Sequence, residues 1–176
     1  MADTLLAVSS SLMRQVVFDS NAVDPVADVS GAYEALESAV NAGKLKILYT
    51  HVNIDELAEI PDLDRRRRLL LLLVALGNLV PTGATAVDYS RINFCRVSDE
   101  SDDFELMRSK SIKHTQDALI ASTARFEQCA LVTNEHRLAK RSRERGIEVL
   151  TSAELLAEFG FTLPIPKPSA TTVPTT

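Results

Sequence analysis

Short apolar runs rich in β-branched residues alternate with segments of helical pattern along most of the chain, and this alternation limits the folds open to it. The strand-like runs are Val16–Phe18, Leu45–Tyr49, Leu79–Val80, Cys129–Val132 and Ile147–Leu150. Strands joined through helices form right-handed βαβ units, in which the strands are parallel and helices cover both faces. The pattern therefore predicts an α/β fold, a three-layer α/β/α sandwich around a central, mainly parallel sheet.

Start and stop signals locate the intervening helices. We expect helices at Ser30–Ala42, Thr50–Ile60, Asp62–Leu76, Thr115–Gln128 with Thr115 as N-cap, Leu138–Arg145, and Thr151–Phe159 with a capping box at its start. Residues 82–110 are less regular. Val87–Val97 fits a helix or a strand, and Ser98–Asp103 is interpreted as an acidic turn before a helix that starts at Phe104.

The length of 176 residues suits one domain with a substantial core. We expect a lead-in at 1–14, the domain at 15–160, and a disordered tail at 161–176, where Pro, Ser and Thr are frequent. The N-terminus lacks the basic region of a signal peptide, and no apolar run is long enough to span a bilayer. A cytoplasmic protein with no membrane association is the resulting prediction.

Composition excludes some functions and leaves others open. Aromatic residues make up only 5% and Trp is absent, which argues against a base-stacking platform. The net charge of −5 argues against a general nucleic-acid binder but permits a nuclease whose acids cluster while basic residues elsewhere hold phosphates. Basic residues are concentrated at Arg65–Arg68 and Arg137–Arg145. Cys95 and Cys129 have no metal-binding spacing and are interpreted as reduced thiols.

The segment Leu69–Val74 is apolar around nearly the whole helix circumference. Such a helix is either packed on two sides within the core or uses its second face in an interface. Both interpretations stay open from the sequence.

Four acids fall at equivalent places in the predicted fold. Asp19 directly follows the first strand, Glu56 and Asp117 lie in the first turns of helices, and Glu135 follows the fourth strand. Strand ends and helix starts gather at one edge of a parallel sheet, where α/β proteins bind their ligands. Four carboxylates there repel one another unless a cation neutralises them or one of them stays protonated. Mg²⁺ or Mn²⁺ takes oxygen ligands and assists phosphoryl transfer, so we predict a metal site for phosphodiester cleavage.

Four stretches that carry these acids resemble the PIN-domain nucleases, which include the VapC-type toxins of toxin–antitoxin pairs. They are Val16–Val23, Thr50–Leu57, Gln116–Ala124 and Leu131–Glu135, and the resemblance covers about residues 15 to 157. It implies a PIN-like fold and a metal-dependent endoribonuclease acting on RNA. For a toxin, it also implies an antitoxin partner and a homodimer.

The resemblance assigns roles residue by residue. Asp19, Glu56 and Asp117 match the regular metal-binding acids, and Glu135 stands where the family usually has Asp. Thr133 matches a small hydroxyl residue of the family pocket, and Asn21 follows the first acid as in many members of the family. The basic residues Arg137, Lys140 and Arg141 follow Glu135 and are candidates for holding the RNA backbone, with a solvated helix face as the alternative.

Other interpretations stay open. A PIN-like module that binds RNA or protein without cutting is one, because Glu135 departs from the family pattern and the middle of the chain matches poorly. A phosphatase with an aspartyl nucleophile at Asp19 is another, but the second acid of that class would fall at Asn21. His114, just before the helix that carries Asp117, is a further candidate for phosphate contact.

Overall fold

A five-stranded parallel sheet forms the centre of the molecule. The computed structural model describes residues 13–97, 101–108 and 111–163. For residues 101–103 it describes the backbone alone. The strands are β1 (Arg14–Phe18), β2 (Leu45–Tyr49), β3 (Gly77–Leu79), β4 (Ala130–Val132) and β5 (Val149–Leu150). Their order is β3-β2-β1-β4-β5, and every neighbouring pair is parallel. The predicted α/β class is confirmed.

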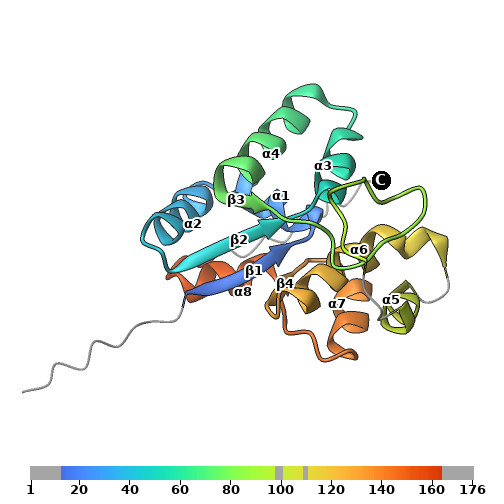
Figure 1. Cartoon of the computed structure of the whole chain (residues 1–176). Helices are drawn as coiled ribbons and strands as arrows, with labels where there is room; N and C mark the ends of the chain where they lie inside the picture. The colour runs from blue at the N-terminus through green and yellow to red at the C-terminus, as the bar shows by residue number, and fades with distance from the viewer. Residues whose placement is uncertain (1–12, 98–100, 109–110, 164–176) are drawn as a thin grey trace, which may run out of the picture.

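Helices cover both faces of this sheet (Figure 1). The α-helices are α1 (Val23–Asp28), α2 (Ala32–Asn41), α3 (His51–Ala58), α4 (Leu63–Leu76), α5 (Ser101–Arg108), α6 (Thr115–Phe126), α7 (His136–Arg143) and α8 (Ser152–Glu158). Two short 3₁₀ turns, η1 (Ser20–Ala22) and η2 (Ile112–His114), precede α1 and α6. Helices α1, α2, α4 and α8 pack on one face, and α5, α6 and α7 pack on the other.

The alternation of side chains along β1 separates the two halves of the core. Val16 and Phe18 point into the layer formed with α2 and α4, whereas Val17 points into the layer formed with α6 and α7. All three are at most 1% exposed. A strand buried on both faces has to be apolar at every position, which explains the unbroken run before Asp19.

Several predicted boundaries differ from those observed. The N-cap of α6 is His114, not Thr115, whose hydroxyl instead donates to the Ile112 carbonyl at 2.8 Å. Helix α5 begins at Ser101 rather than at Phe104, and residues 98–100 of the expected acidic turn lie outside the described residues. The segment Val87–Val97 forms neither a helix nor a strand. It is a loop of turns and bends, in which Cys95 forms an isolated β-bridge with Thr82.

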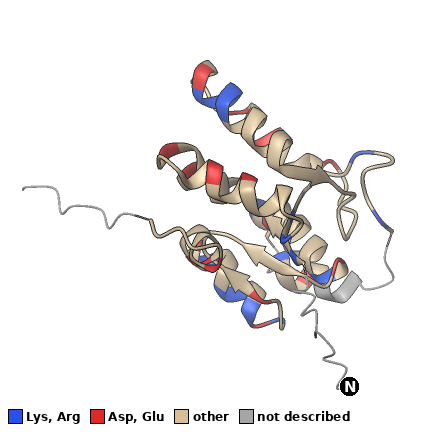
Figure 2. Ribbon diagram, turned by 90° about the vertical axis from the view of Figure 1, so that its left-hand side faces the viewer, with Lys and Arg blue, Asp and Glu red and all other residues tan. Residues whose placement is uncertain are grey.

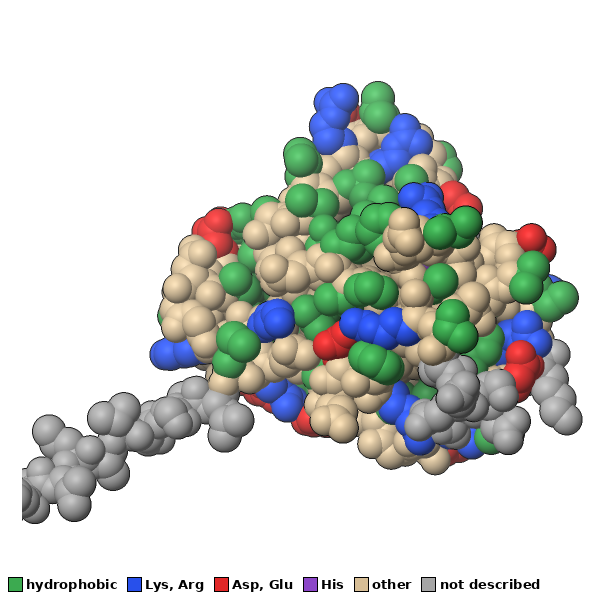
Figure 3. All heavy atoms as spheres, in the orientation of Figure 1, with side chains coloured by type: hydrophobic (Ala, Val, Ile, Leu, Met, Phe, Trp, Pro, Cys, Tyr) green, Lys and Arg blue, Asp and Glu red, His purple; other side chains and the backbone are tan. Residues whose placement is uncertain are grey.

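The leucine-rich part of α4 divides between core and surface. Leu69, Leu72 and Leu73 are buried, whereas Leu71 is 64% and Val74 is 55% exposed. Because this edge of α4 is apolar and exposed, its use in an interface stays a prediction. Figure 3 shows hydrophobic side chains over this face of the molecule and basic ones at the end of α4 that lies nearest α3. At that end Arg65 pairs within the chain, with Asp24 and Asp28.

The chain ends fall largely outside the described residues. This holds for 1–12 of the expected lead-in and 164–176 of the expected tail. Phe161 and Leu163, the described start of that tail, pack partly buried against the core. No helix in the described part of the chain is long and apolar enough to cross a membrane.

Candidate active site

Asp19 lies at the carboxyl end of β1, where the strand turns into η1. Its carboxylate accepts hydrogen bonds from the Ser20 amide at 2.8 Å, the Asn21 side-chain amide at 2.5 Å and the Thr133 hydroxyl at 2.6 Å. The residue is 4% exposed. These donors fix the position of both carboxylate oxygens, so that Asp19 is the most rigidly held acid of the site.

Asn21 connects the end of β1 to the loop after β4. Its side-chain oxygen accepts from the Asn134 amide at 2.8 Å, while its side-chain nitrogen donates to Asp19. Asn134 donates back to the Asn21 carbonyl at 3.1 Å and to the Ser152 hydroxyl at 3.0 Å. The supporting role expected for Asn21 and Thr133 therefore has a physical basis in contacts to the Asp19 carboxylate.

Glu56 reaches the site from α3. Its carboxylate accepts a hydrogen bond from the Ser20 hydroxyl, and that hydroxyl in turn accepts from the Asn53 side-chain amide at 3.2 Å. The same amide nitrogen donates to the Phe18 carbonyl at 3.0 Å, and the Asn53 side-chain oxygen accepts from the Thr50 amide at 2.8 Å. Asn53 thus ties the start of α3 to the end of β1 and brings Glu56 beside Asp19.

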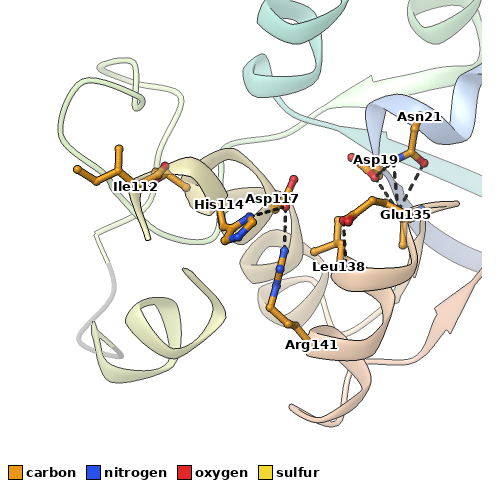
Figure 4. A network of polar contacts seen from close by, with 10 residues as sticks. Asp19, Asn21, Ile112, His114, Asp117, Glu135, Leu138 and Arg141 are labelled. Atoms are coloured by element: carbon orange, nitrogen blue, oxygen red, sulfur yellow. Dashed lines mark hydrogen bonds and ion pairs between the residues drawn. The ribbon is translucent and has the colours of Figure 1, made fainter. Parts of the chain in front are cut away.

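Asp117 lies in the first turn of α6 between two basic side chains (Figure 4). Arg141 of α7 approaches its Oδ2 at 2.8 Å, and the Nδ1 of His114 lies 3.6 Å from the same oxygen. Asp117 and Arg141 are both partly buried, with side chains 28% and 17% exposed. The third acid is therefore paired with the Arg141 guanidinium, and His114 lies nearby.

Glu135 is the N-cap of α7. Its carboxylate accepts from the Leu138 amide at 2.9 Å, and its own amide donates to the Thr133 hydroxyl at 3.0 Å. The contacts in Figure 4 show this acid turned toward its own helix. Capping the helix is a sufficient structural reason for an acid at this position.

The electrostatics of the site show how near these acids lie to one another. Burial raises the pKa of Asp19 to about 6, opposed by its hydrogen bonds and increased by the charge of Asp117. Burial also raises the pKa of Glu56 to about 7, with further increases from the charges of Asp19 and Asp117. The pKa of Asp117 is raised by burial and by Glu135, against the lowering effect of Arg141 and His114. Ionising all of them together is unfavourable without a cation.

The three acids have the donor chemistry that a hard divalent cation prefers, but their carboxylates are not arranged as a preformed metal site. Asp19, Glu56 and Asp117 supply only oxygen atoms, which Mg²⁺ and Mn²⁺ prefer. Among the residues that the structure describes, no group of three or more His, Cys, Asp or Glu lies close enough to hold a metal ion. The repulsion within the set gives a cation a reason to bind, and Asp117 would have to exchange its contact with Arg141.

The three candidate RNA-binding residues differ in their exposure to solvent and in their contacts. Arg137 and Lys140 are exposed on α7, and Lys140 lies 4.0 Å from Glu144. Arg141 faces inward to Asp117 instead. Lys and Arg residues are distributed over several elements rather than confined to α7 (Figure 2). The structure therefore separates Arg141 from its two exposed neighbours.

Sequence reasoning left out three residues that arrange this site. Ser20 contacts Glu56, Asn53 holds Ser20, and Asn134 contacts Asn21. All three stand within the stretches that carry the acids. For Ser20 and Asn134 the signal available in the sequence was their place next to Asp19 and Glu135, because short polar side chains there bond to the neighbouring backbone and carboxylates.

Comparisons with known proteins agree with this architecture. No protein-family model and no curated protein matches the sequence. Among solved structures, PAE2754 from Pyrobaculum aerophilum matches with a TM-score of 0.55 and 17% identity, over 85% of this chain and 98% of that one. VapBC2 from Rickettsia felis, solved with a DNA fragment from its promoter, matches with a TM-score of 0.51 and 14% identity, over 78% and 98%. At these identities the likeness shows the fold, a PIN-like α/β/α sandwich.

Proposed function

We propose that this protein is a metal-dependent endoribonuclease of PIN type that hydrolyses RNA phosphodiester bonds, and that it is the toxin of a toxin–antitoxin pair. The observation that carries the nuclease proposal is that Asp19, Glu56 and Asp117 come from three separate elements and have raised pKa values, chiefly because of burial and further because of the charges of neighbouring acids. Burial of ionised acids lowers the stability of the folded chain, and a bound cation would offset this loss. Acids with such raised pKa values are typical of functional sites.

Asp19, Glu56 and Asp117 would hold Mg²⁺ or Mn²⁺, and Glu135 would assist from the start of α7. The bound cation would lower the pKa of an attacking water and offset charge on the phosphate oxygens. Ser20, Asn21 and Thr133 keep the first two carboxylates oriented through direct hydrogen bonds. Arg137 and Lys140, which are exposed on α7, would contact the RNA backbone.

The toxin proposal draws on the structural neighbour VapBC2, a protein pair from Rickettsia felis bound to DNA of its promoter. An antitoxin partner, a homodimer and a cytoplasmic location belong to this proposal. The exposed apolar edge of α4 at Leu71 and Val74 offers area for one of these contacts.

A cleavage assay with full-length protein, purified free of any bound partner, tests the activity. A mixed RNA panel is incubated with Mn²⁺ or Mg²⁺, with chelator as the metal-free arm. We expect cleavage that needs the metal and that falls by about a hundredfold or more in Asp117→Asn, since a metal ligand is lost. Asp64→Asn is the matched control, because Asp64 also lies in the first turn of a helix but is exposed on α4.

A second function is favoured by one specific observation. The acids are not gathered as a metal cage within the described residues, and Asp117 is held by Arg141. A module that binds RNA or protein without cutting would have these features. Intact RNA binding together with no Mn²⁺ binding and no cleavage, in folded protein, would establish this alternative over the nuclease.

A further inference from the structure

Arg141 reaches from α7 across to the first turn of α6 and contacts an acid of the candidate site. Its Nη2 lies 2.8 Å from Oδ2 of Asp117, and the His114 Nδ1 approaches the same oxygen at 3.6 Å. Figure 4 shows both side chains directed at this carboxylate. One acid of the site thus already has a cation from the protein itself.

The contact uses only part of what the guanidinium offers. An Arg side chain carries five N–H donors, and a bidentate pair with a carboxylate uses two of them. Here the hydrogen bond to Asp117 comes from Nη2, while the buried Nε of Arg141 has no partner among the described residues. A buried donor without a partner is unfavourable, so this pairing is not the best arrangement available to the guanidinium.

We propose that Arg141 is a movable counter-cation of the site. In the metal-free protein it neutralises Asp117 and competes with a divalent cation for that carboxylate. When a cation takes its place, Arg141 turns to a phosphate of the bound RNA, where its planar donors fit two phosphate oxygens. The inference rests on the proposed function, because it requires that Asp117 binds a metal ion.

Charge balance makes this exchange reasonable at each step. A carboxylate oxygen that accepts from Arg141 is less available to a metal ion, and the two cations repel each other if both stay. The RNA phosphate brings the negative charge that the displaced guanidinium then needs. The Arg141 side chain is 17% exposed, and in the proposed exchange it turns toward the bound RNA while α7 keeps its position.

Metal affinity is the first measurement. Titration calorimetry of full-length protein with MnCl₂ is expected to show that Arg141→Gln binds Mn²⁺ about three- to tenfold more tightly than the unchanged protein. Lys140→Gln removes the same charge one residue away, from a side chain that is 70% exposed, and should leave the affinity within about twofold. Arg141→Lys, which keeps the charge without the fork, gives a smaller gain and serves if the Gln variant does not fold.

RNA affinity is the second measurement, and its expected sign is opposite. With Ca²⁺ as a cation that leaves the RNA intact, Arg141→Gln should weaken binding of a labelled single-stranded RNA by about three- to tenfold. With chelator the same substitution should have little effect, because Arg141 then stays on Asp117. Lys140→Gln should weaken binding equally in both conditions.

The outcomes separate the inference from the proposed function. Equal Mn²⁺ affinity in Arg141→Gln and the unchanged protein would overturn the competition while leaving the metal site in place. Equal loss of RNA binding with and without Ca²⁺ would overturn the transfer to phosphate. Absence of Mn²⁺ binding in every variant would overturn the metal site and this inference together.

Discussion

Burial determines the chemistry of the two innermost acids. Asp19 and Glu56 have pKa values raised to about 6 and about 7, from ordinary values of 3.8 and 4.5, chiefly because the surrounding protein excludes water. Both are protonated at low pH and ionised at pH 8 in the metal-free protein. Their ionised forms are less favourable in the folded chain than in the unfolded chain, so the folded chain loses stability as pH rises.

Substitution of Glu56 by Gln tests this residue-scale effect. The stabilising contribution of the raised pKa is present below about pH 4.5 and is lost as pH rises through about 7. Glu56→Gln should therefore raise the free energy of unfolding of the metal-free protein by about 1–2 kcal/mol at pH 8, with little change at pH 5. Urea unfolding at the two pH values measures this. Glu59→Gln, exposed at the end of the same helix, should give a smaller gain at pH 8, because the charge of Glu59 is only a minor cause of the raised Glu56 pKa.

A stability at pH 8 equal to that of the unchanged protein would show that Glu56 is not strained by its surroundings. Addition of Mn²⁺ should remove the benefit of the substitution, because the ion stabilises the folded state in which the carboxylates are ionised.

At the scale of the elements, the start of α7 combines two roles in one residue. Glu135 caps the helix through the Leu138 amide, and its charge raises the pKa of Asp117. The first role holds Leu138, which is 2% exposed, in the core. Substitutions that keep one of these two roles of Glu135 and remove the other can separate them.

Glu135→Ala should lower the free energy of unfolding by about 1 kcal/mol, since an N-cap acceptor is lost. Glu135→Asp should keep stability near that of the unchanged protein, because Asp is among the preferred N-cap residues. Thermal unfolding of both variants, beside the RNA cleavage assay, checks the division. Loss of cleavage in the Ala variant with full cleavage in the Asp variant would assign the acid a part in the site. Unchanged stability in the Ala variant would contradict the capping role.

At the scale of the whole molecule, the loop between β3 and α5 is held against α6. The Gly83 amide donates to the Thr123 hydroxyl at 3.0 Å, and a Cβ at Gly83 would lie 2.2 Å from the Ser122 carbonyl oxygen. Farther along, Arg96 pairs with Glu127 at 2.7 Å. The described part of the loop, residues 80–97, is therefore held in place at Gly83 and Arg96 without regular secondary structure.

Gly83→Ala is expected to lower the free energy of unfolding by about 2–3 kcal/mol, because backbone must move to admit the methyl group. Val87→Ala, in the same loop but 86% exposed, should have an effect within about 0.5 kcal/mol. Urea unfolding of the two variants decides the matter. Equal stability of the two would show that the loop does not pack closely on α6.

Local pattern in the sequence carried the prediction of the sheet and of most helices. Apolar runs at Val16–Phe18 and Cys129–Val132 led to strands, and the capping box at Thr151 was confirmed with Glu154 as its partner. These features depend on burial of one short segment or on bonds within one turn, so neighbouring residues suffice to determine them. The placement of Asp19 after β1 and of Glu135 after β4 followed from the same reasoning.

Only the tertiary structure decided which side chains meet. That Arg141 pairs with Asp117, that Asn53 holds Ser20, and that Gly83 lies on α6 depend on contacts between segments 24 to 40 residues apart in the chain. No periodicity records such contacts, because they arise from how helices pack on the sheet rather than from the order of residues within one element. The sequence by itself determined a parallel α/β chain with acids at one edge. Packing determined how those acids are held, because charge and burial act through distance in space.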